Sequence, residues 1–201
     1  MSFIKTISYQ EADNILKRVY NKVKGKDNVI DNILKVHSLR PHTLTGHMSL
    51  YKNVLHNSNN TLPKWYLECI GVYVSLLNKC DYCVSHHFEG LKRLINNGKK
   101  ANKIKQALET EPDVKVFTDK ELVGLTYAKE LTQKPSEINR STIDSLKLVD
   151  YTDGEILEIN QVAAYFNYAN RTVLGLGVNL DGDIIGLSPN DSTDENNWTH
   201  Q

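Results

Sequence analysis

The stretch Asn78-Lys79-Cys80-Asp81-Tyr82-Cys83-Val84-Ser85-His86-His87 places two thiols and two imidazoles within ten residues. At about 100° per residue of an α-helix, Cys83 lies roughly 60° from Cys80, and His87 returns to within roughly 20° of Cys80. One stripe of a helix would therefore carry both sulfurs and His87. Two thiols beside an imidazole are the equipment of dithiol redox chemistry.

The residues just before this stretch decide how the thiols are used. Glu68 stands twelve residues before Cys80, at the start of the longest apolar run of the chain. In an unbroken helix these two residues would be about 18 Å apart, so we expect a turn at Asn78-Lys79. Such a turn puts Cys80 in the first turn of a new helix, where free N–H groups and the helix dipole favour a thiolate.

Two plainer interpretations of the cysteine pair stay open. Buried cysteines often act only as small apolar residues. Cys80, Cys83 and His87 could also be zinc ligands, although a structural zinc site needs four ligands and the chain has no second pair of this kind. The third cysteine, Cys69, is predicted to serve core packing, and His37, His42, His47 and His56 are predicted to be structural or solvated.

Composition narrows the class of protein. Lysine plus arginine and aspartate plus glutamate both total 24 in 201 residues, so bulk charge attracts neither nucleic acid nor an anionic membrane. The first residues lack a signal-peptide core, and the run 69–77 is too short to span a bilayer. We expect a soluble, cytoplasmic protein without a cofactor or resident metal.

Helical periodicity predicts an all-α fold. Apolar residues recur at helical spacing in Leu122, Leu125, Ala128 and Leu131, and sustained alternation typical of strands is missing. Capping boxes are predicted at Ser8, Thr118 and Thr152, each with a glutamate three residues on. The expected helices cover residues 9–24, 28–37, 43–56, 63–78, 81–97, 100–111, 119–133, 140–149 and 154–175.

Domain organisation is expected to be simple. Residues 1–185 are predicted to form a single helical domain, with Gly175 and Gly177 ending its last helix. Residues 186–201 form a polar C-terminal tail in which Trp198 could dock on a neighbouring element.

The spacing of Glu68, Cys80, Cys83 and His87 resembles the active-site signature of the alkyl hydroperoxidase D-like superfamily, which includes the carboxymuconolactone decarboxylases. Further stretches are similar to its peroxidase-related branch: 36–41, 74–80, 127–132 with Pro135, and 166–171 with Leu174-Gly175. The resemblance covers about residues 28 to 180. It implies a multihelical alkyl hydroperoxidase D-like fold and a homo-oligomer, either dimer, trimer or hexamer.

The resemblance also implies a function. It predicts a thiol-dependent peroxidase of antioxidant defence, in which Cys80 and Cys83 cycle between dithiol and disulfide with a peroxide and a separate dithiol reductant as partners. Glu68 and His87 would form a proton relay, with Tyr82 and His86 in support. By analogy and by its closeness to His87, Cys83 is the expected peroxide-reactive thiol and Cys80 the resolving one.

One departure from the pattern concerns the residue between the cysteines. Alkyl hydroperoxidase D has a histidine there, whereas this chain has Tyr82, a poor base whose hydroxyl can donate a hydrogen bond. Two rival functions stay open: a decarboxylase-like enzyme on the same fold, and a non-enzymatic thiol sensor that oxidises once.

Overall fold

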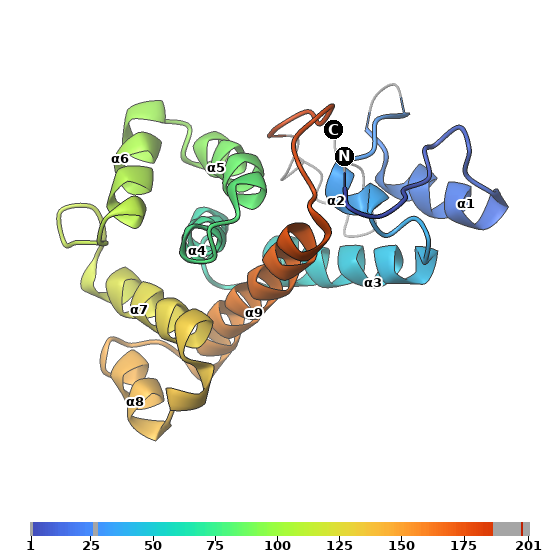
Figure 1. Ribbon diagram of the computed structural model, residues 1–201. Coiled ribbons are helices and arrows are strands. Elements are labelled where there is room, and N and C mark those ends of the chain that lie inside the picture. Colours follow the sequence, from blue (N-terminus) through green and yellow to red (C-terminus); the bar gives the residue numbers. More distant parts are fainter. Residues whose placement is uncertain (1, 26–27, 187–197, 199–201) are drawn as a thin grey trace.

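The computed structural model describes residues 2–25, 28–186 and 198, and these residues form helices joined by short connections (Figure 1). No strand occurs within these ranges. The predicted all-α class is therefore confirmed. In chain order the elements are α1 (Asn14–Val23), α2 (Asn32–Lys35), α3 (Pro41–Tyr51), the π-helix η2 (Lys52–His56), α4 (Lys64–Leu77), α5 (Asp81–Ile95), α6 (Gly98–Glu109), α7 (Asp119–Gln133), the short 3-10 helix η3 (Pro135–Glu137), α8 (Arg140–Leu148) and α9 (Asp153–Leu176).

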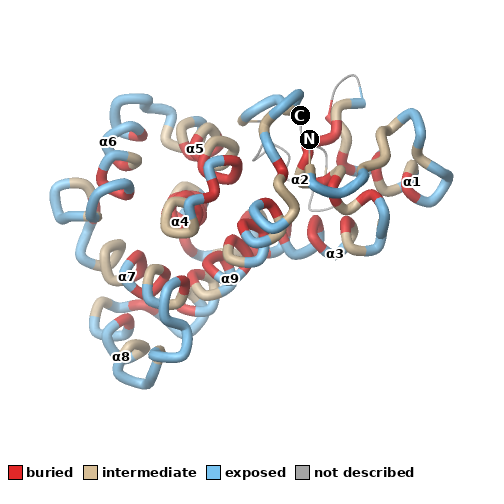
Figure 2. The backbone as a smooth tube through the Cα atoms, in the orientation of Figure 1, coloured by how far each residue is buried: buried red, intermediate tan, exposed pale blue. Residues whose placement is uncertain are grey.

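Helix α4 is the centre of the molecule. Every residue from Tyr66 to Ser75 is buried, as expected for a helix whose sequence is apolar on all sides. It packs against α5, α6, α7 and α9. Figure 2 shows buried residues, in red, along each of these helices. At Gly71 an added Cβ would lie 2.2 Å from the Phe166 ring, so glycine permits the close approach of α4 and α9.

The predicted helix starts at Thr118 and Thr152 are confirmed, because both residues form complete capping boxes with Glu121 and Glu155. The start predicted at Ser8 is wrong. Ser8 and Glu11 do bond each other's backbone N–H groups, but they close only a turn. Helix α1 begins at Asn14 because the Asp13 carboxylate accepts from the N–H groups of the next turn.

The end of α9 differs slightly from the prediction. The helix continues through Gly175 and ends at Leu176, and Gly177 adopts the left-handed conformation that terminates it (φ +62°). Most of the predicted tail 186–201 lies outside the described residues. Within it, the Trp198 ring lies 5.6 Å from Lys22 Nζ and packs against the main core.

Candidate active site

Helices α4 and α5 form a hairpin whose turn presents the cysteine pair. The turn falls at Asn78-Lys79, as predicted, and Lys79 has a positive φ of 57°. The N–H of Cys80 donates to the Ser75 carbonyl (2.9 Å), which closes α4. Cys80 is the N-cap of α5, at the end of the helix where the first N–H groups have no partner within the helix, although its side chain makes no capping hydrogen bond.

The two sulfurs point toward one another. Cys80 Sγ and Cys83 Sγ are 3.1 Å apart, and the residues are 0% and 2% exposed. Since a disulfide bond measures about 2.05 Å, the pair needs to close by only about 1 Å to become linked. Both thiols are free in this structure.

The electrostatic environment separates the two thiols. The pKa of Cys80 is lowered, first because of the hydrogen bond between its sulfur and the Cys83 thiol, and also because of the Cys83 N–H and the Asn170 amide. The pKa of Cys83 is raised by that same bond to Cys80 and by burial. Of the two thiols, Cys80 is therefore the one that loses its proton more readily.

Antiparallel packing of α4 and α5 brings Glu68 to His87. Glu68 Oε2 lies 2.8 Å from His87 Nδ1, and the carboxylate is 1% exposed. In the neutral tautomer whose Nδ1–H donates to the carboxylate, Nε2 of the same ring is the nitrogen that can accept a proton. The structure thus brings Glu68 of α4 into contact with His87 of α5, the helix that carries Cys83.

A second imidazole flanks Glu68. His56, the last residue of η2, places Nε2 3.9 Å from Glu68 Oε1, and its ring contacts Tyr51 edge-on (centroids 4.8 Å apart). Sequence reasoning missed this contact, because η2 departs from α-helical periodicity and its residues point where an α-helix would not place them.

Tyr82 directs its hydroxyl to Asp183 and Ile33. Its hydroxyl donates to Asp183 Oδ2 (2.6 Å) and accepts from the Ile33 N–H (3.1 Å), and burial raises the pKa of this phenol well above its usual value. The His86 ring packs against the Tyr82 ring, with centroids 4.6 Å apart and planes tilted by 36°, and its Nε2 lies 3.5 Å from Asp183 Oδ2. Tyr82 and His86 therefore share Asp183 as a partner, which lies in a polar loop that the sequence did not single out.

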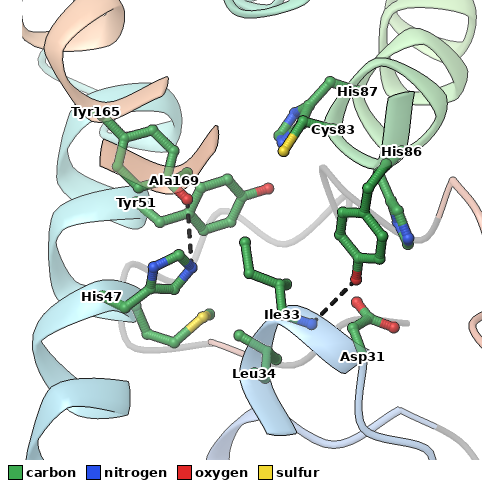
Figure 3. A pocket seen from close by; sticks show the side chains of 12 residues that line it. Asp31, Ile33, Leu34, His47, Tyr51, Cys83, His86, His87, Tyr165 and Ala169 are labelled. Atoms are coloured by element: carbon green, nitrogen blue, oxygen red, sulfur yellow. Dashed lines mark hydrogen bonds between the residues drawn. The ribbon is translucent and has the colours of Figure 1, made fainter. Parts of the chain in front are cut away.

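A small cavity of about 40 Å³ borders the cysteine pair (Figure 3). This volume suits two or three water-sized groups. Cys83 lines the cavity, whereas Cys80 does not. The other lining residues supply imidazoles, phenols, one carboxylate and apolar groups: Asp31, Ile33, Leu34, His47, Met48, Tyr51, Tyr82, His86, His87, Tyr165 and Ala169.

Asn170 of α9 completes the surroundings of the sulfurs. It is fully buried, donates through Nδ2 to Ser75 Oγ (3.1 Å) and accepts from Asn78 Nδ2 (2.9 Å). Its amide is also the last and smallest of the groups that lower the pKa of Cys80, and it partly offsets the raised pKa of Cys83. The residue occurs in the family-like stretch 166–171, but helical periodicity offered no reason to assign it to the site.

Metal binding finds no geometric support in the part of the chain that the structure describes. There, no group of three or more His, Cys, Asp or Glu side chains is arranged to hold an ion. Nor is any described helix both long and apolar enough to cross a membrane.

Comparison with known proteins shows which family part of the chain is similar to. Residues 41–130 match the model of the carboxymuconolactone decarboxylase family, and this segment contains Glu68, Cys80, Cys83 and His87. This segment of the chain is therefore similar to the carboxymuconolactone decarboxylase family. No curated protein matches the chain at a significant level.

Solved structures share the fold at low identity. A peroxidase-related protein with an alkylhydroperoxidase AhpD core from Ralstonia eutropha JMP134 has a TM-score of 0.75 at 18% identity, covering 99% of this chain and 96% of that one. A peroxidase-related protein from Silicibacter sp. TM1040 has a TM-score of 0.71 at 22% identity, covering 84% and 87%. The debrominase Bmp8, bound to 2,3,4-tribromopyrrole, has a TM-score of 0.71 at 16% identity, covering 90% and 95%.

Proposed function

We propose that this protein is a thiol-dependent peroxidase that reduces a hydroperoxide while Cys80 and Cys83 pass from dithiol to disulfide. The observation that carries the proposal is the 3.1 Å approach of the two sulfurs at a cavity that His87 also lines. Two thiols that only packed a core would need neither the buried Glu68–His87 pair nor the hydrogen-bond donors around Cys80. Antioxidant defence is the role that this chemistry suits.

The first step transfers an oxygen atom to sulfur. His87 takes one proton from the thiol pair, and the Glu68 carboxylate at 2.8 Å stabilises the imidazolium that forms. When the remaining proton sits on Cys80, the Cys83 thiolate attacks the distal oxygen of the peroxide, and the O–O bond breaks. The imidazolium returns its proton to the leaving oxygen, giving an alcohol or water and a sulfenic acid on Cys83.

The second step links the sulfurs. The Cys80 thiol condenses with the Cys83 sulfenic acid, forming the S–S bond and releasing water. An external dithiol then reduces the disulfide and is itself oxidised. These two thiols and the external dithiol supply all the electrons that the cycle needs.

Cys83 is assigned the attack because it lines the cavity, whereas Cys80 does not. The lowered pKa of Cys80 favours the opposite assignment, because Cys80 loses its proton more readily than Cys83. We give geometry more weight, since a proton can cross between sulfurs 3.1 Å apart whereas a peroxide cannot reach a fully covered atom. Sulfenic acid should then be trapped in Cys80→Ser. Trapping in Cys83→Ser alone would reverse the assignment.

Turnover separates this function from its rivals. The purified protein is mixed with a hydroperoxide and excess dithiothreitol, and peroxide loss is followed while mass spectrometry maps linked cysteines. Continuous consumption with a Cys80–Cys83 disulfide supports the peroxidase. One stoichiometric oxidation without turnover would support a thiol sensor instead. Lactone decarboxylation that survives loss of both thiols would support the decarboxylase-like alternative.

A further inference from the structure

The cysteine pair is buried in a small apolar cluster that is separate from the main core. Cys80 and Cys83 belong to a small apolar cluster whose other members come from α2, from the end of α9 and from the chain that follows it. Val178 and Leu180 contribute from that following segment. The cluster's buried members are Val36, Cys80, Tyr82, Cys83, Val173 and Val178.

The segment 178–186, which we call the strap, contributes to this cluster. It leaves the end of α9 and passes between α5 and α2 (Figure 1). Glycines with positive φ stand before it, within it and at its end: Gly177 (+62°), Gly182 (+82°) and Gly186 (+82°). These are positions at which the backbone turns without a side chain in the way.

One carboxylate fastens the strap to the redox helix. The Asp183 side chain is completely buried; it accepts from the Tyr82 hydroxyl (2.6 Å) and from the Asn32 N–H (3.0 Å to each oxygen). His86 Nε2 lies 3.5 Å away on the same side. A buried carboxylate needs such donors, so these contacts hold position 183 in place.

Asn32 of α2 secures the same segment a second time. Its Nδ2 donates to the carbonyls of Asn179 (2.8 Å) and Asp181 (2.9 Å). Of these two sets of hydrogen bonds, the one at Asp183 includes Tyr82, the residue between Cys80 and Cys83 in the sequence. The strap is thus joined to the Cys-x-x-Cys turn through Tyr82.

We propose that the strap controls which thiols reach the sulfur pair, with Asp183 as the residue that sets this specificity. The inference rests on the proposed peroxidase cycle. A small peroxide enters the 40 Å³ cavity with the strap closed. A reducing thiolate must attack one sulfur of the disulfide while the other sulfur leaves as a thiolate. Both cysteines are buried, so the closed structure gives such a thiolate no access to either sulfur. The strap therefore lifts for the reductant and not for the oxidant.

The test is the rate of thiol alkylation by iodoacetamide in the reduced protein, mapped to each cysteine by mass spectrometry. Asp183→Ala removes the acceptor that fastens the strap, so labelling of the Cys80–Cys83 pair should accelerate about tenfold. The matched control is Asp181→Ala, because Asp181 is an exposed carboxylate of the same strap whose side chain accepts from Asn179 Nδ2, a neighbour two residues away. It should label at the wild-type rate.

Cys69 reports unfolding in the same sample, because it is fully buried in the main core and should stay unlabelled. If Cys69 labels together with the pair in Asp183→Ala, Tyr82→Phe decides, since it removes one hydroxyl and keeps the ring. The proposal is overturned if Cys80 and Cys83 label at the wild-type rate in whichever of Asp183→Ala and Tyr82→Phe keeps Cys69 unlabelled. Alkylation needs no peroxide, so this result stands even if the peroxidase activity is not found.

Discussion

Two buried cysteine environments lie within fifteen residues of each other, and they differ in nearly everything except burial. Cys69 is fully buried in the middle of α4, and burial raises the pKa of its thiol far above the ordinary value. Cys80 is equally buried, yet its pKa is lowered. Burial alone therefore does not decide the chemistry of a thiol in this protein.

Position along a helix explains the difference. In mid-helix the N–H groups around Cys69 are used by the helix, so nothing offsets the loss of water around a thiolate. At the N-cap, the Cys80 sulfur lies 3.1 Å from the Cys83 sulfur, and the Cys83 thiol, the Cys83 N–H and the Asn170 amide each lower the pKa of Cys80. These three groups thus outweigh the desolvation that dominates at Cys69.

Removing either member of the pair should give the largest effect. Cys80→Ser or Cys83→Ser should lower steady-state peroxide consumption by about three orders of magnitude or more, because the disulfide can no longer form. Cys69→Ala should consume peroxide at the wild-type rate. A comparable loss in Cys69→Ala would break the contrast between the two environments.

The Glu68–His87 contact should come next. Glu68→Gln removes the charge that stabilises the imidazolium, and peroxide-driven disulfide formation in single turnover should slow by about a hundredfold. The control is Glu89→Gln, a half-exposed carboxylate of α5 that pairs with Lys92. Equal rates in wild type and Glu68→Gln would remove the relay from the mechanism.

The pH dependence of alkylation should show the two environments directly. Since the pKa of Cys80 is lowered, thiolate persists at Cys80 as pH falls below the range of ordinary thiols, whereas Cys69 should stay unreactive as pH rises. This profile is recorded in Asp183→Ala, which keeps the Cys83 thiol beside Cys80, with the labelling mapped to each cysteine by mass spectrometry. A Cys80 rate that follows an ordinary thiol would contradict the stabilised thiolate.

Asn170→Ala sharpens the same measurement. Losing this donor raises the pKa of Cys80, so labelling near neutral pH should slow by on the order of a few-fold and recover at higher pH. Asn167→Ala is the matched control, because Asn167 lies on the same helix and also accepts from Asn78 but bonds neither sulfur. A pH-independent loss would indicate a packing defect instead.

The smallest effect is expected on stability at the other site. Cys69→Ala leaves a small cavity in the main core and should lower the free energy of unfolding by about 1 kcal/mol, read from urea denaturation. Labelling of Cys80 and Cys83 should not change. Faster labelling of the pair would show that the two environments are mechanically coupled.

Local rules predicted a large part of this molecule. The bounds of α4 and α5, the turn at Asn78-Lys79 and the capping boxes at Thr118 and Thr152 followed from spacing and side-chain chemistry. These features depend on residues a few positions apart, whose relative placement the backbone fixes within one or two helical turns. The stripe predicted for Cys80, Cys83 and His87 differs at its first member, because Cys80 is the N-cap of α5 with non-helical backbone angles, whereas Cys83 and His87 lie within α5 and line the same cavity.

Contacts between distant segments were beyond such rules. The Tyr82–Asp183 bond joins residues 101 positions apart, and the donors from Asn170 reach the sulfurs from a helix that begins some seventy residues later. The approach of His56 to Glu68 depends on the π-helix η2, which the α-helical periodicity of the sequence does not predict. The sequence by itself determined the helices and the placement of Cys83 and His87 on one of them. The tertiary structure decided which polar groups of α9 and the strap surround the thiols, because only packing brings segments that are distant in the sequence together.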